Sequence, residues 1–189
     1  CEAIYQVDFF NHVFGAYRMR GMLDDEEKLA ALKEKNIPAF KAMAEEWYGT
    51  KDLPTEKALV INMLNMYAKN VPTDHQPEGF KKLVAKAKGD FTSMVDKAWS
   101  KSIFTSKERY LAFLDKPSGK TLDKDMFFQV VSETFAAFQN ARSNPESTEA
   151  NHKLEEANRL FVQGLRKMNP DKKYYPNANS TLRLTYGSV

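Results

Sequence analysis

The chain has 189 residues, of which 42% are hydrophobic and 28% are charged. This composition is typical of a globular domain and excludes a disordered or collagen-like chain. The 28 basic and 25 acidic residues leave a formal net charge of only +3, so charge alone indicates no nucleic-acid partner.

The single cysteine is Cys1, which excludes a disulfide framework and a metal site built from thiolates. No apolar run reaches the roughly 18 residues that a membrane span needs, so we expect no membrane insertion. The residues from Glu2 to Gln6 already follow an amphipathic pattern. Because natural N-termini usually begin outside regular structure, we expect the chain to be part of a longer protein.

Apolar residues recur at three- and four-residue spacing, which predicts one helix after another up to about residue 168. The second helix should kink or break near Ile37, because Pro38 lacks the N–H that a helix interior uses. No fixed repeat is present, so the predicted fold is an all-α, irregular multi-helix bundle. The expected helices cover approximately residues 4–21, 24–49, 53–70, 78–88, 90–101, 105–116, 123–141 and 145–168.

Local patterns add detail to several of these helices. Thr105 and Glu108 have the spacing of a capping box, in which the threonine side chain accepts from the Glu108 N–H. Phe127 and Phe135 are expected to fill a core between the last two long helices, where they would pack against the apolar side chains of the helix at 145–168. Core packing is also expected of three methionines at apolar helical positions: Met63, Met66 and Met126.

The character of the chain changes at Asn169 and Pro170. A loop-like stretch is followed by Thr181–Tyr186, in which apolar and polar residues alternate strictly and predict one half-buried strand. Residues 1–168 contain no second strand pattern, and a lone strand cannot satisfy its backbone groups. We therefore expect this strand to be the first of a truncated β-domain.

The three histidines suggest no metal site. His12 follows Asp8 by four residues and is expected to lie on the surface beside this carboxylate, and His152 lies near two glutamates in the same manner. His75 is expected in a loop. Because no histidine has a second one four residues away, the sequence predicts neither a metal nor another cofactor.

Two further motifs have simpler structural interpretations. Ser118–Thr121 is spelled like the end of a phosphate-binding loop, but Leu114 stands where that loop needs glycine. The lysines of Lys81–Lys88 alternate with apolar residues and are expected to form a solvated helix face, not a nucleic-acid site. We find no set of serine, histidine and aspartate, so no catalytic, cofactor-binding or metal-binding residue is predicted in this chain.

The run Tyr175–Gly187 resembles a segment of the bacterial serine dipeptidyl peptidases of peptidase family forty-six. Asn177 stands where aspartate is expected, and Glu108–Leu114 resembles the last part of the same family's helical insert. The resemblance implies a chymotrypsin-like double β-barrel with an inserted helical domain. Residues 1–170 would then be the helical cap, and residues 171–189 the linker and first strand of the second barrel.

The resemblance further implies a periplasmic parent enzyme, a hydrolase that releases dipeptides from the N-termini of peptide substrates and forms a homodimer. Its catalytic histidine and aspartate precede the insert and its serine follows, so the cap would only shape and gate the active-site cleft. One alternative stays open, a helical protein-interaction module whose terminal strand pairs with the sheet of a partner. Nucleic-acid binding through Lys81–Lys88 is a third, weaker interpretation.

Overall fold

A computed structural model describes residues 6–173, and all regular structure within this range is helical. The prediction of an all-α fold is thus confirmed for these residues, whereas the predicted strand at Thr181–Tyr186 lies outside them. The chain divides into two compact units, residues 1–141 and residues 142–189. The predicted domain boundary near residue 170 stays a prediction.

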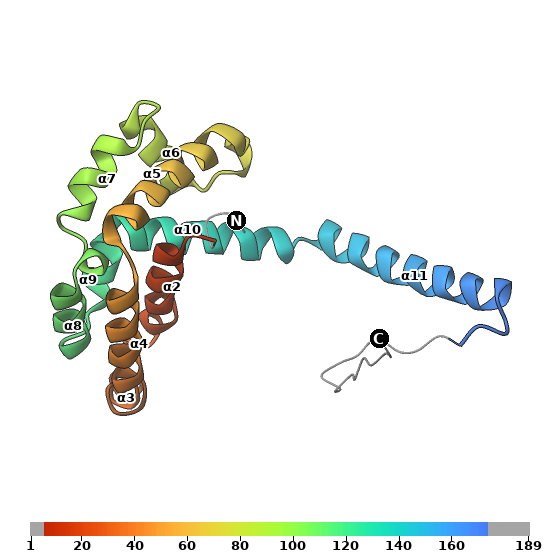
Figure 1. Ribbon diagram of the computed structural model, residues 1–189, viewed down its shortest axis with the longest axis horizontal. Coiled ribbons are helices and arrows are strands. Elements are labelled where there is room, and N and C mark those ends of the chain that lie inside the picture. Colours follow the sequence, from red (N-terminus) through yellow and green to blue (C-terminus); the bar gives the residue numbers. More distant parts are fainter. Residues whose placement is uncertain (1–5, 174–189) are drawn as a thin grey trace, which may run out of the picture. The chain divides into compact units, whose positions relative to one another are not determined.

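The elements of the first unit are joined by short loops (Figure 1). They are α2 (Asp8–Arg20), α3 (Glu26–Ala31), the π-helical turn η1 (Leu32–Asn36), α4 (Ile37–Thr50), α5 (Leu53–Asn70), the 3₁₀ turn η2 (Thr73–His75), α6 (Glu78–Ala87), α7 (Thr92–Trp99), the 3₁₀ turn η3 (Ile103–Thr105), α8 (Lys107–Asp115), α9 (Gly119–Lys124) and α10 (Met126–Arg142), which ends at the first residue of the second unit. The second unit contains α11 (Pro145–Met168).

The predicted break near Ile37 is confirmed and takes the form of a π-helical turn. The Ile37 N–H bonds to the carbonyl of Leu32, five residues earlier, so the helix widens just before Pro38. A proline lacks the N–H for an α-helical bond and crowds the preceding turn, and a wider turn accommodates both effects. η1 therefore separates α3 from α4.

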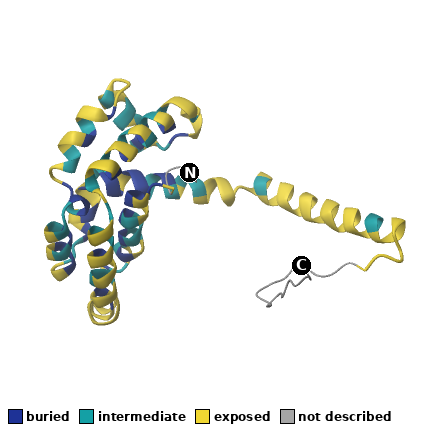
Figure 2. Cartoon of the chain, in the orientation of Figure 1, coloured by how far each residue is buried: buried dark blue, intermediate teal, exposed yellow. Residues whose placement is uncertain are grey.

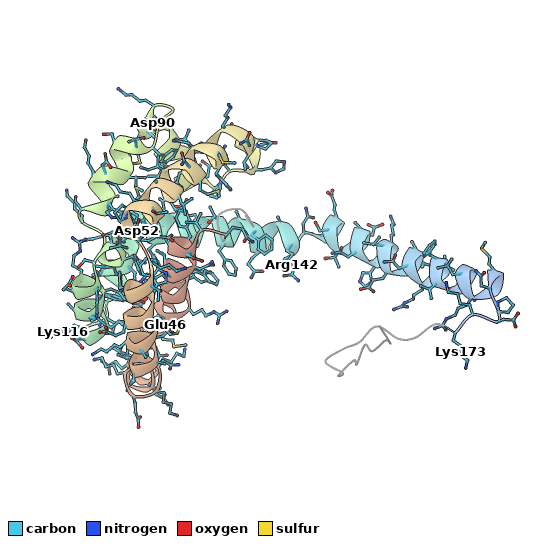
Figure 3. The ribbon with its side chains drawn as sticks, viewed as in Figure 1. Glu46, Asp52, Asp90, Lys116, Arg142 and Lys173 are labelled. Carbon is cyan, nitrogen blue, oxygen red and sulfur yellow. The ribbon has the colours of Figure 1, made fainter. Side chains whose placement is uncertain are left out.

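Aspartate carboxylates accept from backbone N–H groups at the starts of several helices. Asp52 accepts from the N–H of Thr55 at 3.0 Å, and Asp90 accepts from the N–H of Thr92 at 3.0 Å (Figure 3). Each bond satisfies a backbone donor that the first turn of a helix leaves unpaired. The helix ranges for α5 and α11 agree with the predicted ones.

The capping box predicted from Thr105 is wrong by one residue. Ser106 is the N-cap of α8, accepting from the Arg109 N–H at 3.3 Å and donating to Glu108 at 2.6 Å. Thr105 is buried and donates its hydroxyl to the carbonyl of Trp99 at 2.5 Å. The burial of Thr105 removes its side chain from the helix start, and the next residue provides the cap.

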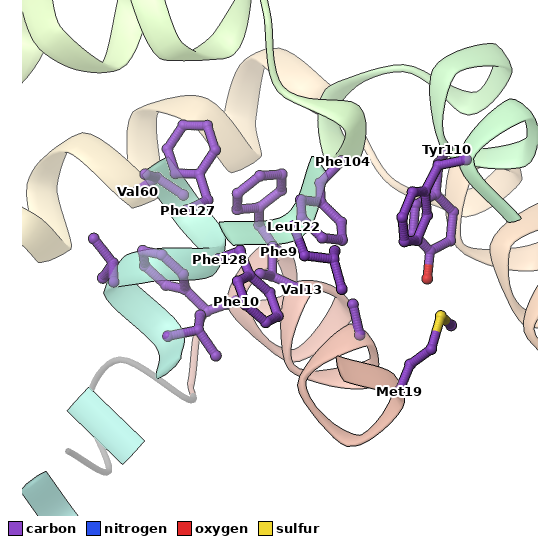
Figure 4. Close-up of a cluster of buried hydrophobic side chains, with 14 of the residues drawn as sticks. Phe9, Phe10, Val13, Met19, Val60, Phe104, Tyr110, Leu122, Phe127 and Phe128 are labelled. Carbon is purple, nitrogen blue, oxygen red and sulfur yellow. The ribbon is translucent and has the colours of Figure 1, made fainter. Parts of the chain in front are cut away.

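The core of the first unit is built around α2, whose Phe9, Phe10 and Val13 are fully buried (Figure 4). Phe127 of α10 packs edge-on against Phe9, with ring centroids 5.0 Å apart. Its other ring contact is Trp99 of α7, so its neighbours are α2 and α7. The expectation that Phe127 packs between the last two long helices is therefore wrong.

The lysine-rich segment folds as predicted. Phe80 of α6 is fully buried, and Leu83, Val84 and Ala87 pack against the core. The lysines of α6 occupy the rest of the helix surface, as an amphipathic helix requires. Among the methionines, Met63 and Met126 pack against the core, whereas Met66 is 56% exposed and contradicts the prediction.

Helix α11 is amphipathic but has no buried residue. Figure 2 shows exposed residues along almost its whole length. Within its own unit, α11 therefore buries none of its apolar residues. The large apolar side chains that α11 exposes are Leu154, Leu160, Phe161, Val162 and Met168.

Candidate functional site

His12 lies within a cluster of aromatic rings, not on the surface as predicted. Its ring stacks on Trp47, with centroids 4.4 Å apart and planes within 8°. Tyr48 and Tyr110 contact it edge-on, at 5.3 and 4.7 Å between ring centroids. Asp8 does not pair with His12 but forms an ion pair with Lys51. We call these four rings, His12, Trp47, Tyr48 and Tyr110, the His12 cluster.

The hydrogen bonds of the His12 cluster define the tautomer of its imidazole. The Tyr48 hydroxyl donates to the carbonyl of Phe104 at 2.8 Å, and the same oxygen lies 3.3 Å from Nε2 of His12. Because a tyrosine has one proton to donate, Nε2 of His12 must be the donor toward Tyr48. Burial lowers the pKa of His12 to about 4. The imidazole is therefore neutral at pH 7. The cluster joins α2, α4 and α8, and Tyr48 bonds it to η3.

The other two histidines lie elsewhere. His75 is exposed in η2, 3.9 Å from Asp74, and His152 is exposed on α11. Residues 6–173 contain no group of three or more His, Cys, Asp or Glu side chains placed to hold a metal ion.

A buried carboxylate holds the start of α2. Glu56 of α5 is only 6% exposed, and its Oε2 accepts from the N–H of Phe9 at 2.9 Å. Val7, the N-cap of α2, offers no side-chain cap. Glu56 thus satisfies an N-terminal donor of a helix 47 residues away in the sequence. Sequence reasoning missed this residue, since nothing in the local pattern of α5 distinguishes it from a solvent-facing glutamate.

Replacing Glu56 by alanine should lower the free energy of unfolding by about 1–3 kcal/mol, because the buried Phe9 N–H loses its acceptor. Glu56→Gln keeps an acceptor oxygen and should cost less. Urea denaturation of both variants and the unchanged chain measures the difference. Equal losses for alanine and glutamine would contradict the capping role.

A second buried carboxylate, Asp125, joins η3 to the start of α10. Its Oδ1 accepts from the N–H of Phe127 at 3.0 Å, and its Oδ2 accepts from the N–H of Ile103 at 3.1 Å. Burial raises the pKa of Asp125, while these backbone donors and Ser102 oppose the shift. Both oxygens are thus occupied by groups of the protein, and Asp125 serves the fold.

The glycine in the motif Ser118–Thr121 lies next to an ion pair between Arg20 and Asp123. Arg20 of α2 donates to both oxygens of Asp123, at 2.8 Å each, and holds the pKa of this carboxyl below its usual value. A Cβ at Gly119 would lie 2.8 Å from the Cζ atom of Arg20. Glycine therefore gives the guanidinium room to brace α2 against α9, and the preceding α8 is helical, unlike the strand of a phosphate-binding loop.

These groups hold helices of the first unit in place through hydrogen bonds between segments distant in the sequence. The His12 cluster, the two buried carboxylates and the Arg20–Asp123 pair all act within the first unit. Across residues 6–173, no helix is both long and apolar enough to cross a membrane.

Comparison with known proteins identifies the class of protein to which the chain belongs. A family model described as Peptidase S46 matches residues 7–189. The chain is therefore part of a peptidase. More particularly, the chain belongs to the peptidase S46 family.

Curated relatives agree with this assignment. A protein named dipeptidyl-peptidase 7 from Capnocytophaga gingivalis is 34% identical over 143 residues, 76% of this chain and 19% of that protein. An Asp/Glu-specific dipeptidyl-peptidase from Porphyromonas gingivalis is 27% identical over 178 residues, 90% of this chain and 24% of that protein. The chain thus spans about a fifth to a quarter of the length of these relatives. No solved structure matches the chain significantly.

Proposed function

We propose that the chain is the helical cap domain of a serine-type dipeptidyl peptidase. The observation that carries the proposal is the family match over residues 7–189, combined with a region of purely helical structure from residue 8 to residue 168. The matched relatives include proteins named for dipeptidyl-peptidase activity, which supports peptides as the substrates of the whole protein. The resemblance noted at Tyr175–Gly187 supports a periplasmic location.

In this role, the helices limit how much of the peptide substrate fits into the active-site cleft. They do not take part in cutting it. A cap that covers one end of an active-site cleft leaves room for a fixed number of residues beyond the cut bond, and the product is then a dipeptide. Such a cap has to keep its shape under the load of a bound peptide. The buried carboxylate of Glu56 and the Arg20–Asp123 pair are well suited to this, since each connects α2 to a helix distant in the sequence.

The residues that cut the peptide would then lie outside this chain. One relative is named as Asp/Glu-specific and the other name specifies no residue. We assign the pocket for the residue before the cut bond to the remainder of the whole protein as well. No residue of this chain receives a catalytic role in the proposal.

The purified 189-residue chain should not hydrolyse dipeptidyl chromogenic substrates, whereas the longer protein that contains it should. The reason is that nucleophile, base and oxyanion donors must act together in one site. The measurement is release of the chromophore at equal molar concentration of the two proteins. Turnover by the chain alone that disappears on replacing one of its serines would overturn the proposal.

The cap role itself can be tested in the longer protein by loosening the cap. Phe127→Ala should let the enzyme release products longer than dipeptides, seen by mass spectrometry, while a serine-directed phosphonate still labels the nucleophile. Met66→Ala changes an exposed residue of the same unit and should leave the products unchanged. Exclusive release of dipeptides by a Phe127→Ala enzyme with a demonstrably loosened cap would refute the gating role.

A further inference from the structure

A hollow of about 290 Å³ lies between α9 and the segment that joins α7 to η3. Its lining residues are Lys101, Ile103, Lys120, Thr121, Lys124 and Asp125. The three lysines are exposed and come from two places in the chain, Lys101 from the residues after α7 and the other two from α9. All six residues belong to the first unit. We call this hollow the lysine pocket.

The positive charge of the lysine pocket is not neutralised by its surroundings. Among residues 6–173, none of its three lysines forms an ion pair. The lining holds three lysines and one aspartate, so its net charge is +2. Every acidic side chain between residues 96 and 125 has another partner: Lys57 for Asp96, Ser106 for Glu108, Lys41 for Asp115, Arg20 for Asp123 and backbone N–H groups for Asp125. Because like charges gathered at one place repel each other, the pocket favours an anionic ligand.

The spacing of the lysines indicates which anion fits. Lys120 and Lys124 are four residues apart on α9, so they share one face of the helix, ~6 Å apart along its axis. In an extended peptide, side chains two residues apart point to the same side and lie ~6.6 Å apart, at ~3.3 Å per residue. Carboxylates at alternate positions of an extended peptide therefore match the two lysines of α9. Ile103 offers apolar surface to the methylene groups of such side chains.

The lining lacks the groups that select a phosphate by its shape. A guanidinium presents a planar fork to a phosphate, whereas each lysine supplies only a point charge. The arginine that contacts α9, Arg20, is already bound to Asp24 and Asp123. Helix α9 has only six residues, too few for its N-terminus to serve as an anion site. Separate ammonium groups thus favour separate carboxylates over one compact oxyanion.

We propose that the lysine pocket binds an extended peptide segment that carries carboxylates at alternate positions. Lys120 and Lys124 each receive one carboxylate, and Lys101 adds a third positive charge from the segment before η3. These contacts lie at the surface, so the binding is of modest affinity and weakens as the salt concentration rises. The assignment of this peptide as a substrate of the whole protein rests on the proposed function, whereas its binding to the pocket does not.

The first experiment measures the binding of three labelled peptides to the 189-residue chain by fluorescence anisotropy. Each is a six-residue serine peptide with an amidated C-terminus. The first has glutamates at its second and fourth positions, the second has them at its second and fifth, and the third has glutamines at its second and fourth. The first should bind at least about threefold more tightly than the second, because only glutamates two residues apart share a side. The third should show no binding.

The lysines are tested by combining Lys120→Gln with Lys124→Gln, which should weaken binding of the first peptide about tenfold at low ionic strength, since two charge pairs are lost. The matched control combines Lys82→Gln with Lys86→Gln. These two lysines of α6 have the same four-residue spacing, are exposed and form no ion pair within residues 6–173. The control should change the affinity by less than about twofold. Circular dichroism checks that both variants keep their helices.

The second experiment asks whether the bound peptide is a substrate. In the longer protein, the double variant of α9 should raise KM for a peptide with this glutamate pair after its second residue by about tenfold, relative to a neutral peptide of the same length. The effect on the acidic peptide should lie in KM and not in kcat. An unchanged ratio of KM values would refute the substrate assignment. A longer protein that releases no dipeptides would refute the proposed function, while the binding results would still decide the role of the pocket.

Three results of the binding experiment would overturn the proposal. Equal affinities for the first and second peptides would mean that the pocket does not distinguish the spacing of the carboxylates. Equal losses in the double variants of α9 and α6 would assign the binding to the net charge of the chain. Sodium phosphate that displaces the peptide more strongly than sodium chloride at equal ionic strength would make the pocket a site for a single oxyanion.

Discussion

Replacing Phe127 by alanine should lower the free energy of unfolding by about 3–5 kcal/mol. The side chain is fully buried, and its ring packs edge-on against Phe9 and Trp99, with centroids 5.0 and 5.7 Å apart. Its removal leaves a cavity among rings from α2, α7 and α10, which cannot collapse without moving helices that other contacts hold. Thermal or urea denaturation of the 189-residue chain measures the loss.

Two further variants give the expected ranking. Phe135 is only half-buried, with ring contacts to Phe14 and Tyr17 at 4.9 and 5.0 Å, so Phe135→Ala should cost less than Phe127→Ala. Met66 is 56% exposed, and Met66→Ala should change stability by no more than about 0.5 kcal/mol. If Phe135→Ala proved as costly as Phe127→Ala, the core would have to include the outer face of α10.

Acid should destabilise this protein well before most carboxylates are protonated, because His12 must take up a proton in a buried aromatic environment. Burial lowers its pKa from 6.5 to about 4 in the folded chain. The unfolded chain binds the proton first as the pH falls, so the contribution of neutral His12 to stability is complete above about pH 6.5 and is lost between 6.5 and 4. The shift corresponds to a loss of about 3 kcal/mol in all.

The measurement is the free energy of unfolding at a series of pH values from 7.5 to about 4. His12→Phe keeps an aromatic ring for stacking on Trp47 but cannot be protonated, so its stability should depend much less on pH in this range. His75→Phe is the control, since His75 is exposed and its replacement should leave the pH dependence unchanged. If the free energy of unfolding depended on pH in the same way for the unchanged chain and for His12→Phe, protonation of His12 would not be the cause of the acid destabilisation.

The structure also reverses one expectation about His12. On the surface beside Asp8, this histidine would be replaceable by alanine at little cost. Within the His12 cluster, the same replacement removes a stacked ring and leaves the Tyr48 hydroxyl without its donor. The local spacing of Asp8 and His12 is correct for a shared helix face, but Lys51 takes the carboxylate and Trp47 takes the ring.

Much of the helical architecture was predictable because its signals are local. The period of the apolar residues located α5 and α11, Pro38 marked the π-helical turn, and the alternation within Lys81–Lys88 predicted which face of α6 is buried. The family resemblance was equally local, since it rested on two short runs of residues, Glu108–Leu114 and Tyr175–Gly187. Helix geometry depends on residues three and four apart, and the sequence lists these next to one another.

Only the tertiary structure shows which residues on other helices a given side chain contacts. The hydrogen bond from Phe9 to Glu56 joins two residues that are 47 positions apart in the sequence. The His12–Tyr48 bond joins residues 36 positions apart, and the Arg20–Asp123 ion pair joins residues 103 positions apart. A periodic pattern indicates that a helix has an apolar face, but not which element covers that face. For this reason the sequence by itself determined the helices and the family, whereas the packing of the helices decided that His12 lies among aromatic rings and that Gly119 makes room for Arg20.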